Sequence, residues 1–141
     1  MSCIIYNNTN DCVTLLHPGV GYAVAWVLEN DFPKMPDAAG AVPQIVDPET
    51  LPWADEDFFD AWKIVDGVVT VRLDKAKEIT KARLRREREP LLAAQDVAFQ
   101  RALENGSDTS AIVAEKQRLR DITLLPNSCT TLAELRALNC S

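Results

Sequence analysis

The chain of 141 residues is 47% hydrophobic and 26% charged, ordinary values for a globular protein that exclude a chain disordered throughout. A domain of this length can bury roughly 70% of the surface of its unfolded chain. The formal net charge is −6, and the longest apolar run, 22–28, is far shorter than the ~20 residues that cross a membrane, so a membrane-spanning protein is not expected.

The first part of the chain is predicted to form strands and one short helix. Ser2–Tyr6 and Cys12–Leu16 are rich in β-branched and apolar residues and flank the turn-forming cluster 7–11, which indicates a β-hairpin. After a break at Pro18, the segment 22–30 is predicted to form a short apolar helix. The expected inner face of this helix consists of Val24, Val27 and Leu28.

Prolines punctuate the stretch 31–52, within which only Gln44–Val46 has the composition of a strand. The next segment, 53–62, is both acidic and aromatic. Its aromatic residues are expected to pack a small core beneath the strands, the alternative being a ligand cage. Its carboxylates lack the glycine and the terminal glutamate of a calcium-binding EF-hand loop. The residues concerned are Trp53, Phe58, Phe59 and Trp62, with Asp55, Glu56, Asp57 and Asp60.

The clearest hairpin follows this aromatic segment. Asp66 and Gly67 stand between two runs rich in β-branched residues, Ala61–Val65 and Val68–Val71. An Asp-Gly pair in this setting predicts a two-residue turn of type I′, because both positions require a positive φ.

The stretch 73–123 is predicted to form a helical hairpin. Apolar residues between Ala76 and Leu103 recur mostly at spacings of three and four, the pattern of one helix face. Pro90 interrupts the first helix, but the apolar stripe roughly keeps its phase, which favours one kinked and nearly continuous helix. Gly106 then predicts a helix end and a tight turn into an antiparallel second helix. The residues available to cap that helix are Ser107, Asp108 and Thr109.

A short helix is predicted near the end of the chain, where Thr131 and Glu134 have the spacing of a capping box. The predicted fold class is therefore α+β. A small antiparallel β unit with a short helix is expected over 1–72, followed over 73–141 by the antiparallel helical hairpin and the short C-terminal helix.

Charge is distributed unevenly along the chain. Arg72–Glu89 contains eight basic and four acidic residues, whereas Glu29–Asp60 contains nine acidic residues and one lysine. One interpretation is a solvated basic helix face that neutralises the acidic segment, in the same or a neighbouring subunit. The other is nucleic-acid binding, which is not favoured because the basic run lacks interleaved aromatic residues and any known module pattern.

The four cysteines lie in pairs near the two ends of the sequence, as Cys3 and Cys12, and as Cys129 and Cys140. Their spacings match no zinc-binding or redox motif, even with His17, so no metal or cofactor is expected. The N-terminal residues do not have the pattern of a signal peptide, and synthesis in a reducing cytoplasm is expected. Two states stay open: four reduced, buried thiols, or disulfides formed after release from the cell, within or between subunits. Within one chain, a Cys3–Cys12 bond would cross-link the first hairpin and a Cys129–Cys140 bond the C-terminal segment.

An enzyme is not expected. The single histidine, His17, precedes a proline in a turn, and no nucleophile motif accompanies it. The five glycines form no phosphate-binding loop.

Several segments of the chain resemble a known group of proteins. The similarity is strongest in the second half of the chain and weaker in Ile4-Ile5-Tyr6, Val13 and His17-Pro18. The main segments are 59–62 (FDAW), 74–79 (DKAKEI), 83–85 (RLR), 90–97 (PLLAAQDV), 101–104 (RALE), 114–121 (AEKQRLRD) and 130–135 (TTLAEL). Through them the chain resembles a family of small proteins encoded among the tail genes of bacteriophages and prophages. The cysteines depart from the expected pattern.

The resemblance implies a non-enzymatic structural component of the phage tail, at the baseplate or tail fibre, made in the bacterial cytoplasm and present in the virion. Its expected partners are other tail proteins, in a homo- or hetero-oligomer. One alternative is a tail or tail-fibre assembly chaperone absent from the mature virion, and another is a nucleic-acid-binding regulatory module. The residues expected to make contacts are Lys81, Arg83, Arg85, Arg86, Arg88, Leu91 and Phe99.

Overall fold

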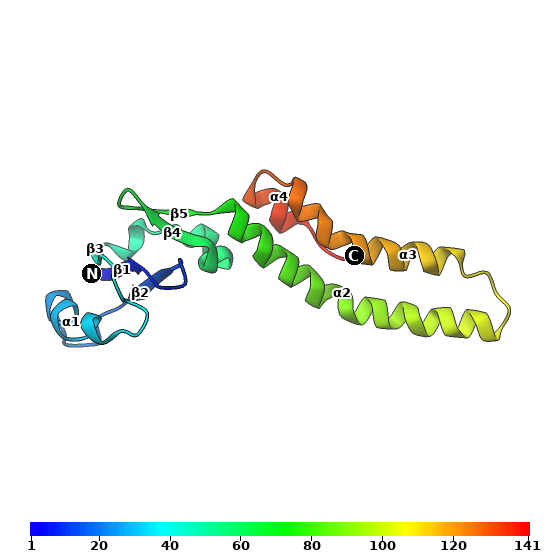
Figure 1. Cartoon of the computed structure of the whole chain (residues 1–141), viewed down its shortest axis with the longest axis horizontal. Helices are drawn as coiled ribbons and strands as arrows, with labels where there is room; N and C mark the ends of the chain where they lie inside the picture. The colour runs from blue at the N-terminus through cyan, green and yellow to red at the C-terminus, as the bar shows by residue number, and fades with distance from the viewer. The chain divides into compact units, whose positions relative to one another are not determined.

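The computed structural model describes all 141 residues, Met1–Ser141, and has the predicted α+β fold (Figure 1). The chain divides into two compact units, Met1–Arg72 and Leu73–Ser141. The first unit contains all five strands and one short helix, and the second is helical. We describe each unit by itself. None of the helices is at once long and apolar enough to span a bilayer.

The first unit is built on a three-stranded antiparallel sheet, in the order β2-β1-β3. Asn7 pairs with Val13, so the turn-forming cluster closes the predicted hairpin. The Asn8 carboxamide oxygen accepts the N–H groups of Asn10 and Cys12 at 2.9 and 3.1 Å, which holds the turn by a side chain. The strands are β1 (Cys3–Asn7), β2 (Val13–Leu16) and β3 (Gln44–Val46).

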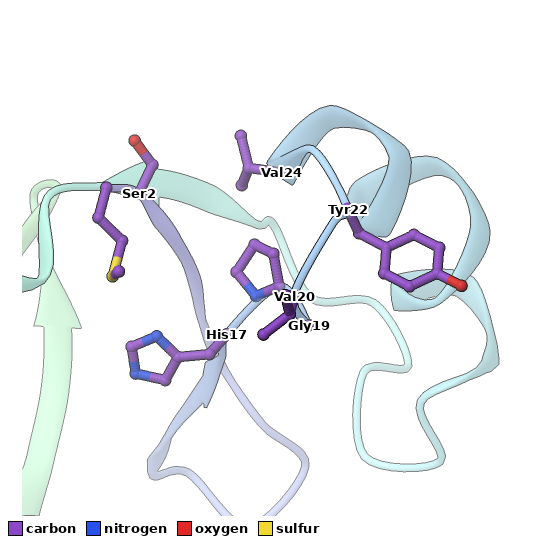
Figure 2. Close-up of a pocket in the computed structure, with 8 residues that line it drawn as sticks. Ser2, His17, Gly19, Val20, Tyr22 and Val24 are labelled. Atoms are coloured by element: carbon purple, nitrogen blue, oxygen red, sulfur yellow. The ribbon is translucent and has the colours of Figure 1, made fainter.

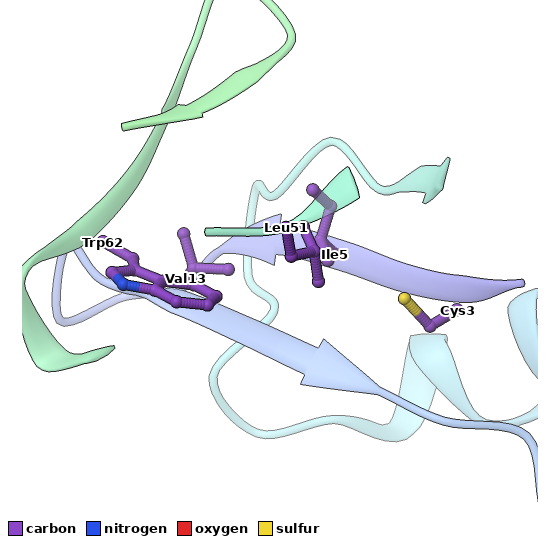
Figure 3. Packing of buried hydrophobic residues seen from close by; sticks show 5 residues of the cluster. All are labelled: Cys3, Ile5, Val13, Leu51 and Trp62. Carbon is purple, nitrogen blue, oxygen red and sulfur yellow. The ribbon is translucent and has the colours of Figure 1, made fainter. Parts of the chain in front are cut away.

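Successive side chains of β1 point to opposite faces of the sheet, and each face packs in its own cluster, so both faces of β1 are buried. Cys3 and Ile5 pack on one face against Val13, Leu51 and the fully buried Trp62 (Figure 3). The opposite face of β1 packs against the short helix α1 (Val24–Asn30). The residues of this second cluster are Ile4, Tyr6 and Val27, with Val24 and Leu28 against them, as the sequence predicts.

A second antiparallel pair, β4 (Trp62–Val65) and β5 (Val68–Val71), forms the hairpin predicted from the Asp-Gly pair. Asp66 and Gly67 have φ values of 52° and 80°, as a type I′ turn requires. The aromatic stretch before it, Trp53–Ala61, is wound as 3₁₀ helix. Phe58 and Phe59 pack inward as expected, but Trp53 stays 39% exposed at the edge of Trp62.

The second unit is organised around one long helix, α2 (Leu73–Glu104), which continues through Pro90. Pro90 is exposed, so the helical hydrogen bond it cannot donate is lost on the solvent side, where water can satisfy the carbonyl of Arg86. The predicted continuity of the helix through Pro90 is therefore confirmed.

The turn after α2 uses Gly106 at a φ of 66°. The N–H of Ser107 bonds the carbonyl of Ala102 at 2.8 Å, and the N–H of Gly106 bonds that of Leu103 at 3.2 Å. This pair of bonds is a Schellman motif, which satisfies carbonyls that the helix end leaves free. The antiparallel helix α3 (Ser110–Asp121) follows, and Asp108 accepts the N–H of Ser110 at 3.0 Å near its start.

The chain then turns back onto the hairpin. A 3₁₀ helix, Ile122–Ser128, leads into α4 (Leu132–Ala137). The predicted N-cap is present, since Thr131 Oγ1 accepts from the N–H of Glu134 at 3.2 Å. The Glu134 carboxylate accepts from the N–H of Thr130 at 2.7 Å, one residue before the N–H that a capping box uses. A core joins α2, α3 and the C-terminal residues. It consists of Leu84, Leu119, Ile122 and Cys140, with Leu92 and Leu138 packed against them.

Candidate interaction surfaces

Two arginines expected on an interaction surface instead hold the second unit together. Arg83 donates from Nη2 to the carbonyl oxygens of Leu135 and Leu138, at 3.1 and 2.8 Å, where α4 ends. Arg88 donates from Nη1 to the carbonyl oxygen of Arg120 at 2.9 Å, in the last turn of α3. The last carbonyls of a helix have no intrahelical donor, so a guanidinium there supplies hydrogen bonds and complements the helix dipole.

A third arginine acts in the same way from α3. Arg118 donates to both carboxylate oxygens of Glu115, at 2.6 and 2.9 Å, and also to the carbonyl oxygen of Cys140 at 2.9 Å. The Cys140 side chain is buried between the helices, with its thiol 3.5 Å from the carbonyl oxygen of Leu84. The segment after α4 is thus anchored by arginines and by one buried side chain.

The other predicted contact residues divide into two groups. Lys81 is bound to Glu78 at 2.9 Å, and the Phe99 ring lies 5.1 Å beneath the ammonium of Lys116, so both are engaged within the unit. The remaining three predicted contact residues are exposed on the surface of α2. These are Arg85, Arg86 and Leu91.

Besides the predicted contact residue Leu91, the helical hairpin exposes three other large apolar side chains, and one of them, Leu103, was expected on the packed face of α2. Leu91 is 40% exposed, Val97 and Val113 are each 50% exposed, and Leu103 is 60% exposed. A two-helix hairpin has only one face per helix against its neighbour, so the other faces depend on solvent or on a partner. These residues make the hairpin a candidate protein-binding surface.

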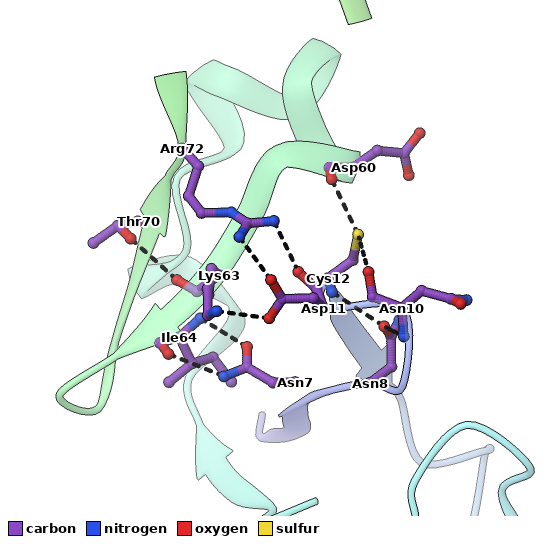
Figure 4. A network of polar contacts seen from close by, with 10 residues as sticks. All are labelled: Asn7, Asn8, Asn10, Asp11, Cys12, Asp60, Lys63, Ile64, Thr70 and Arg72. Atoms are coloured by element: carbon purple, nitrogen blue, oxygen red, sulfur yellow. Dashed lines mark hydrogen bonds and ion pairs between the residues drawn. The ribbon is translucent and has the colours of Figure 1, made fainter. Parts of the chain in front are cut away.

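A polar clamp closes the first unit (Figure 4). The Asp11 carboxylate accepts from Lys63 Nζ at 2.6 Å and from Arg72 Nη1 at 2.7 Å, while Arg72 Nη2 donates to the carbonyl oxygen of Asp11 at 3.1 Å. The hydrogen bonds from Lys63 and then Arg72 lower the pKa of the Asp11 carboxyl. Asp11 has a φ of 60°, which aims its side chain from the β1–β2 turn at the β4–β5 hairpin.

Asn7 joins the two sheets of the first unit. Its carboxamide oxygen accepts from the N–H of Ile64 at 2.9 Å, and its amide nitrogen donates to the carbonyl of Ile64 at 3.0 Å (Figure 4). The Asn7 amide thus pairs with both the N–H and the carbonyl of Ile64, as the backbone of a neighbouring strand would.

Asp37 secures the proline-rich loop over the sheet. Its carboxylate accepts from the Tyr6 hydroxyl at 2.7 Å and from Thr14 Oγ1 at 2.8 Å. The hydrogen bond from Tyr6, followed by that from Thr14, lowers the pKa of Asp37. Burial, together with the hydrogen bond to Asp37, raises the pKa of Tyr6 to about 12. Tyr6 therefore stabilises the fold as the neutral phenol, and Asp37 as the charged carboxylate.

An exposed apolar surface lies at the start of α1. Tyr22 and Trp26 have ring centroids 4.7 Å apart and are 56% and 43% exposed, and Val20 is fully exposed. Beside them is an open pocket of about 370 Å³. Figure 2 shows Val24 and His17 at opposite sides of this pocket, with the Tyr22 ring pointing outward from the start of α1.

All four cysteines are free thiols in the structure. The strand register excludes the Cys3–Cys12 alternative within one chain. Asn7 pairs with Val13, so Cys12 lies at the turn while Cys3 lies at the far end of β1, about 15 Å away at the usual rise of a strand. A disulfide requires Cα atoms about 4–7 Å apart. Burial raises the pKa of the Cys3 and Cys140 thiols, which favours their protonated forms.

His17 is exposed at the edge of the pocket near α1. No group of three or more His, Cys, Asp or Glu side chains is arranged to hold a metal ion.

The residues that join the two sheets of the first unit were not predicted from the sequence. Asn7 and Asp11 were read only as turn formers, and Arg72 only as the start of a basic run. Their partners lie 52 to 61 residues away in the chain, so no local pattern reveals them. The one available signal was Asp11 in a turn cluster that needs a positive φ.

Comparison with known proteins adds no relative to this picture: no family model matches the chain, and neither the curated proteins nor the solved structures yield a match.

Proposed function

We propose that this chain is a non-enzymatic structural component of a bacteriophage tail, associated with the baseplate or tail fibre, and that it works through protein–protein contacts. The observation that carries the proposal is the helical hairpin of α2 and α3. It leaves Val97, Leu103 and Val113 at least half exposed, on elements whose inner faces are already packed. The similarity of the segments in this hairpin to phage tail-gene products supplies the tail assignment.

The chain's own packing supports a contact role for the outer surface of the hairpin. Arg83 and Arg88 donate hydrogen bonds to carbonyls at the ends of α4 and α3, so contacts within the unit hold the hairpin in place. The outer faces of the hairpin are not used in these contacts and are free to bind a partner. A rigid, preformed surface loses little conformational freedom on binding, which favours assembly.

Peptide mass fingerprinting of gradient-purified virions tests the proposal. Peptides of this chain are expected in the particle at a stoichiometry comparable with other tail proteins. Their presence in the infected-cell lysate but absence from the particle would contradict the component proposal and favour the assembly chaperone.

A further inference from the structure

The face formed by Tyr22, Trp26 and Glu29 combines a carboxylate with two aromatic rings that contact each other at a tilt. The rings lie 4.7 Å apart at an interplanar angle of 37°, and both remain about half exposed. Glu29 is exposed and follows Trp26 by three residues in α1, so the two side chains share one helix face. The Asn30 amide donates to the carbonyl oxygen of Trp26 at 2.8 Å and steadies the end of this short helix.

This combination suits a guanidinium group. The planar guanidinium of arginine stacks on an aromatic face through cation–π attraction while its N–H groups pair with a carboxylate. The charge of the unit favours the same ligand. Met1–Arg72 contains eleven acidic and three basic residues, a formal net charge of −8. A partner of opposite charge is therefore attracted to this unit.

The chain itself supplies such a ligand. Leu73–Ser141 contains twelve basic and ten acidic residues, a formal net charge of +2. Of the basic residues on α2, Arg83 and Arg88 are held by backbone carbonyls, whereas Arg85 and Arg86 are exposed. The exposed neighbours of these two arginines on α2 are Ala82, Glu89 and Pro90. Ala82 and Pro90 lack long side chains, and no ion pair joins Glu89 to either arginine, so both guanidinium groups can be approached by a partner.

We propose that the Tyr22–Trp26–Glu29 face of one copy binds Arg85 and Arg86 of a second copy, so that the chain self-associates head to tail. The contact is heterologous, because each copy contributes a different surface to each side. Such contacts form a ring where the rotation between copies closes and a filament where it does not. The inference goes beyond the proposed tail function, since self-association requires no other tail protein.

Sedimentation velocity of the full chain over a range of concentrations tests the proposal. The wild type is expected to form oligomers at about 0.05 M salt and to dissociate at about 0.5 M, where exposed charges are screened. Glu29→Arg, Trp26→Ala and the double variant Arg85→Glu/Arg86→Glu are each expected to weaken association at least about tenfold. The matched controls, Glu49→Arg in the first unit and Arg101→Glu on α2, are expected to associate as the wild type does.

A mixing experiment gives the sharpest result. Glu29→Arg carries two basic surfaces and Arg85→Glu/Arg86→Glu carries two acidic ones, so each protein alone is expected to stay monomeric. An equimolar mixture restores opposite charges at both contacts and is expected to associate. Circular dichroism confirms that each variant is folded. A monomeric wild type at low salt, wild-type association of either reversal variant, or a mixture that stays monomeric would overturn the proposal. Each of these results leaves the presence of the chain in the virion as a separate question.

Discussion

The guanidinium of Arg83 donates a hydrogen bond of 2.8 Å to the carbonyl oxygen of Leu138, the residue that follows the last turn of α4. This contact ties the C-terminal segment to the long helix across 55 residues of sequence. Arg83, which was predicted to contact a partner, thus stabilises the packing of the second unit. Arg88 repeats the arrangement at the end of α3.

Arg83→Ala is expected to lower the free energy of unfolding of the second unit by about 1–3 kcal/mol, because two carbonyls lose a charged donor in a partly buried place. Urea denaturation followed by far-UV circular dichroism, to which α2 and α3 contribute most, measures the change. Arg101→Ala serves as the control, since Arg101 is exposed on the same helix and lies outside the proposed contact, and it is expected to change stability by less than about 0.5 kcal/mol. Equal effects of the two variants would contradict the anchoring role of Arg83.

Asn7→Ala is expected to destabilise the first unit by about 1–3 kcal/mol, because the N–H and carbonyl of Ile64 both lose their partner. Tryptophan fluorescence isolates this unit, since Trp26, Trp53 and Trp62 all lie within it. Asn10→Ala is the matched control from the same turn, because only the backbone of Asn10 makes the contacts described above. An Asn7→Ala protein as stable as this control would show that the sheets need no amide bridge.

The stability of the first unit is expected to fall at both ends of the pH range. The pKa of Asp37 is lowered in the folded state, so its contribution is present above the pKa of the unfolded chain, about 4, and is lost as the pH falls through the folded pKa. The pKa of Tyr6 is raised to about 12, so its contribution is complete below about 10 and is lost as the pH rises through the folded value.

Urea denaturation by tryptophan fluorescence at a series of pH values checks both limbs. Asp37→Asn is expected to flatten the acid limb, and Tyr6→Phe the alkaline limb, while each lowers the stability at neutral pH. Unchanged limbs in these variants would assign the pH dependence to other groups, of which the Asp11 clamp is the first candidate at low pH, because the pKa of Asp11 is also lowered.

Gly106→Ala is expected to destabilise the helical hairpin by about 1–2 kcal/mol. An added Cβ meets no atom within 4 Å, so the whole cost comes from holding an alanine at a φ of 66°. Ser107→Ala keeps the backbone N–H that completes the Schellman motif and should leave the unfolding midpoint unchanged. Circular dichroism during urea denaturation compares the two. A neutral Gly106→Ala would mean that the turn relaxes to another conformation.

Local chemistry predicted most elements of the fold. The Asp66-Gly67 turn, the helix end at Gly106 and the N-cap at Thr131 each require particular residues at fixed spacings, and all three occur as expected. The helix α2 runs through Pro90 because the proline lies on the exposed face. Features that depend on tertiary packing could not be predicted from the sequence. One of them is the partial exposure of Trp53 at the rim of the core.

The contact surfaces were less predictable, because the sequence shows which residues are basic but not which are already engaged. Arg83 and Arg86 are three positions apart and look alike in the sequence, yet one binds two backbone carbonyls and the other is exposed. The difference depends on where α4 returns to α2, a relationship between segments about 50 residues apart. The same holds for Asn7 and Ile64.

Electron microscopy of purified particles that carry a gold-labelled tag on this chain shows whether the chain is part of a phage tail. Label is expected at the baseplate or tail fibre in most particles. Unlabelled particles from lysates that contain the tagged protein would contradict this proposal.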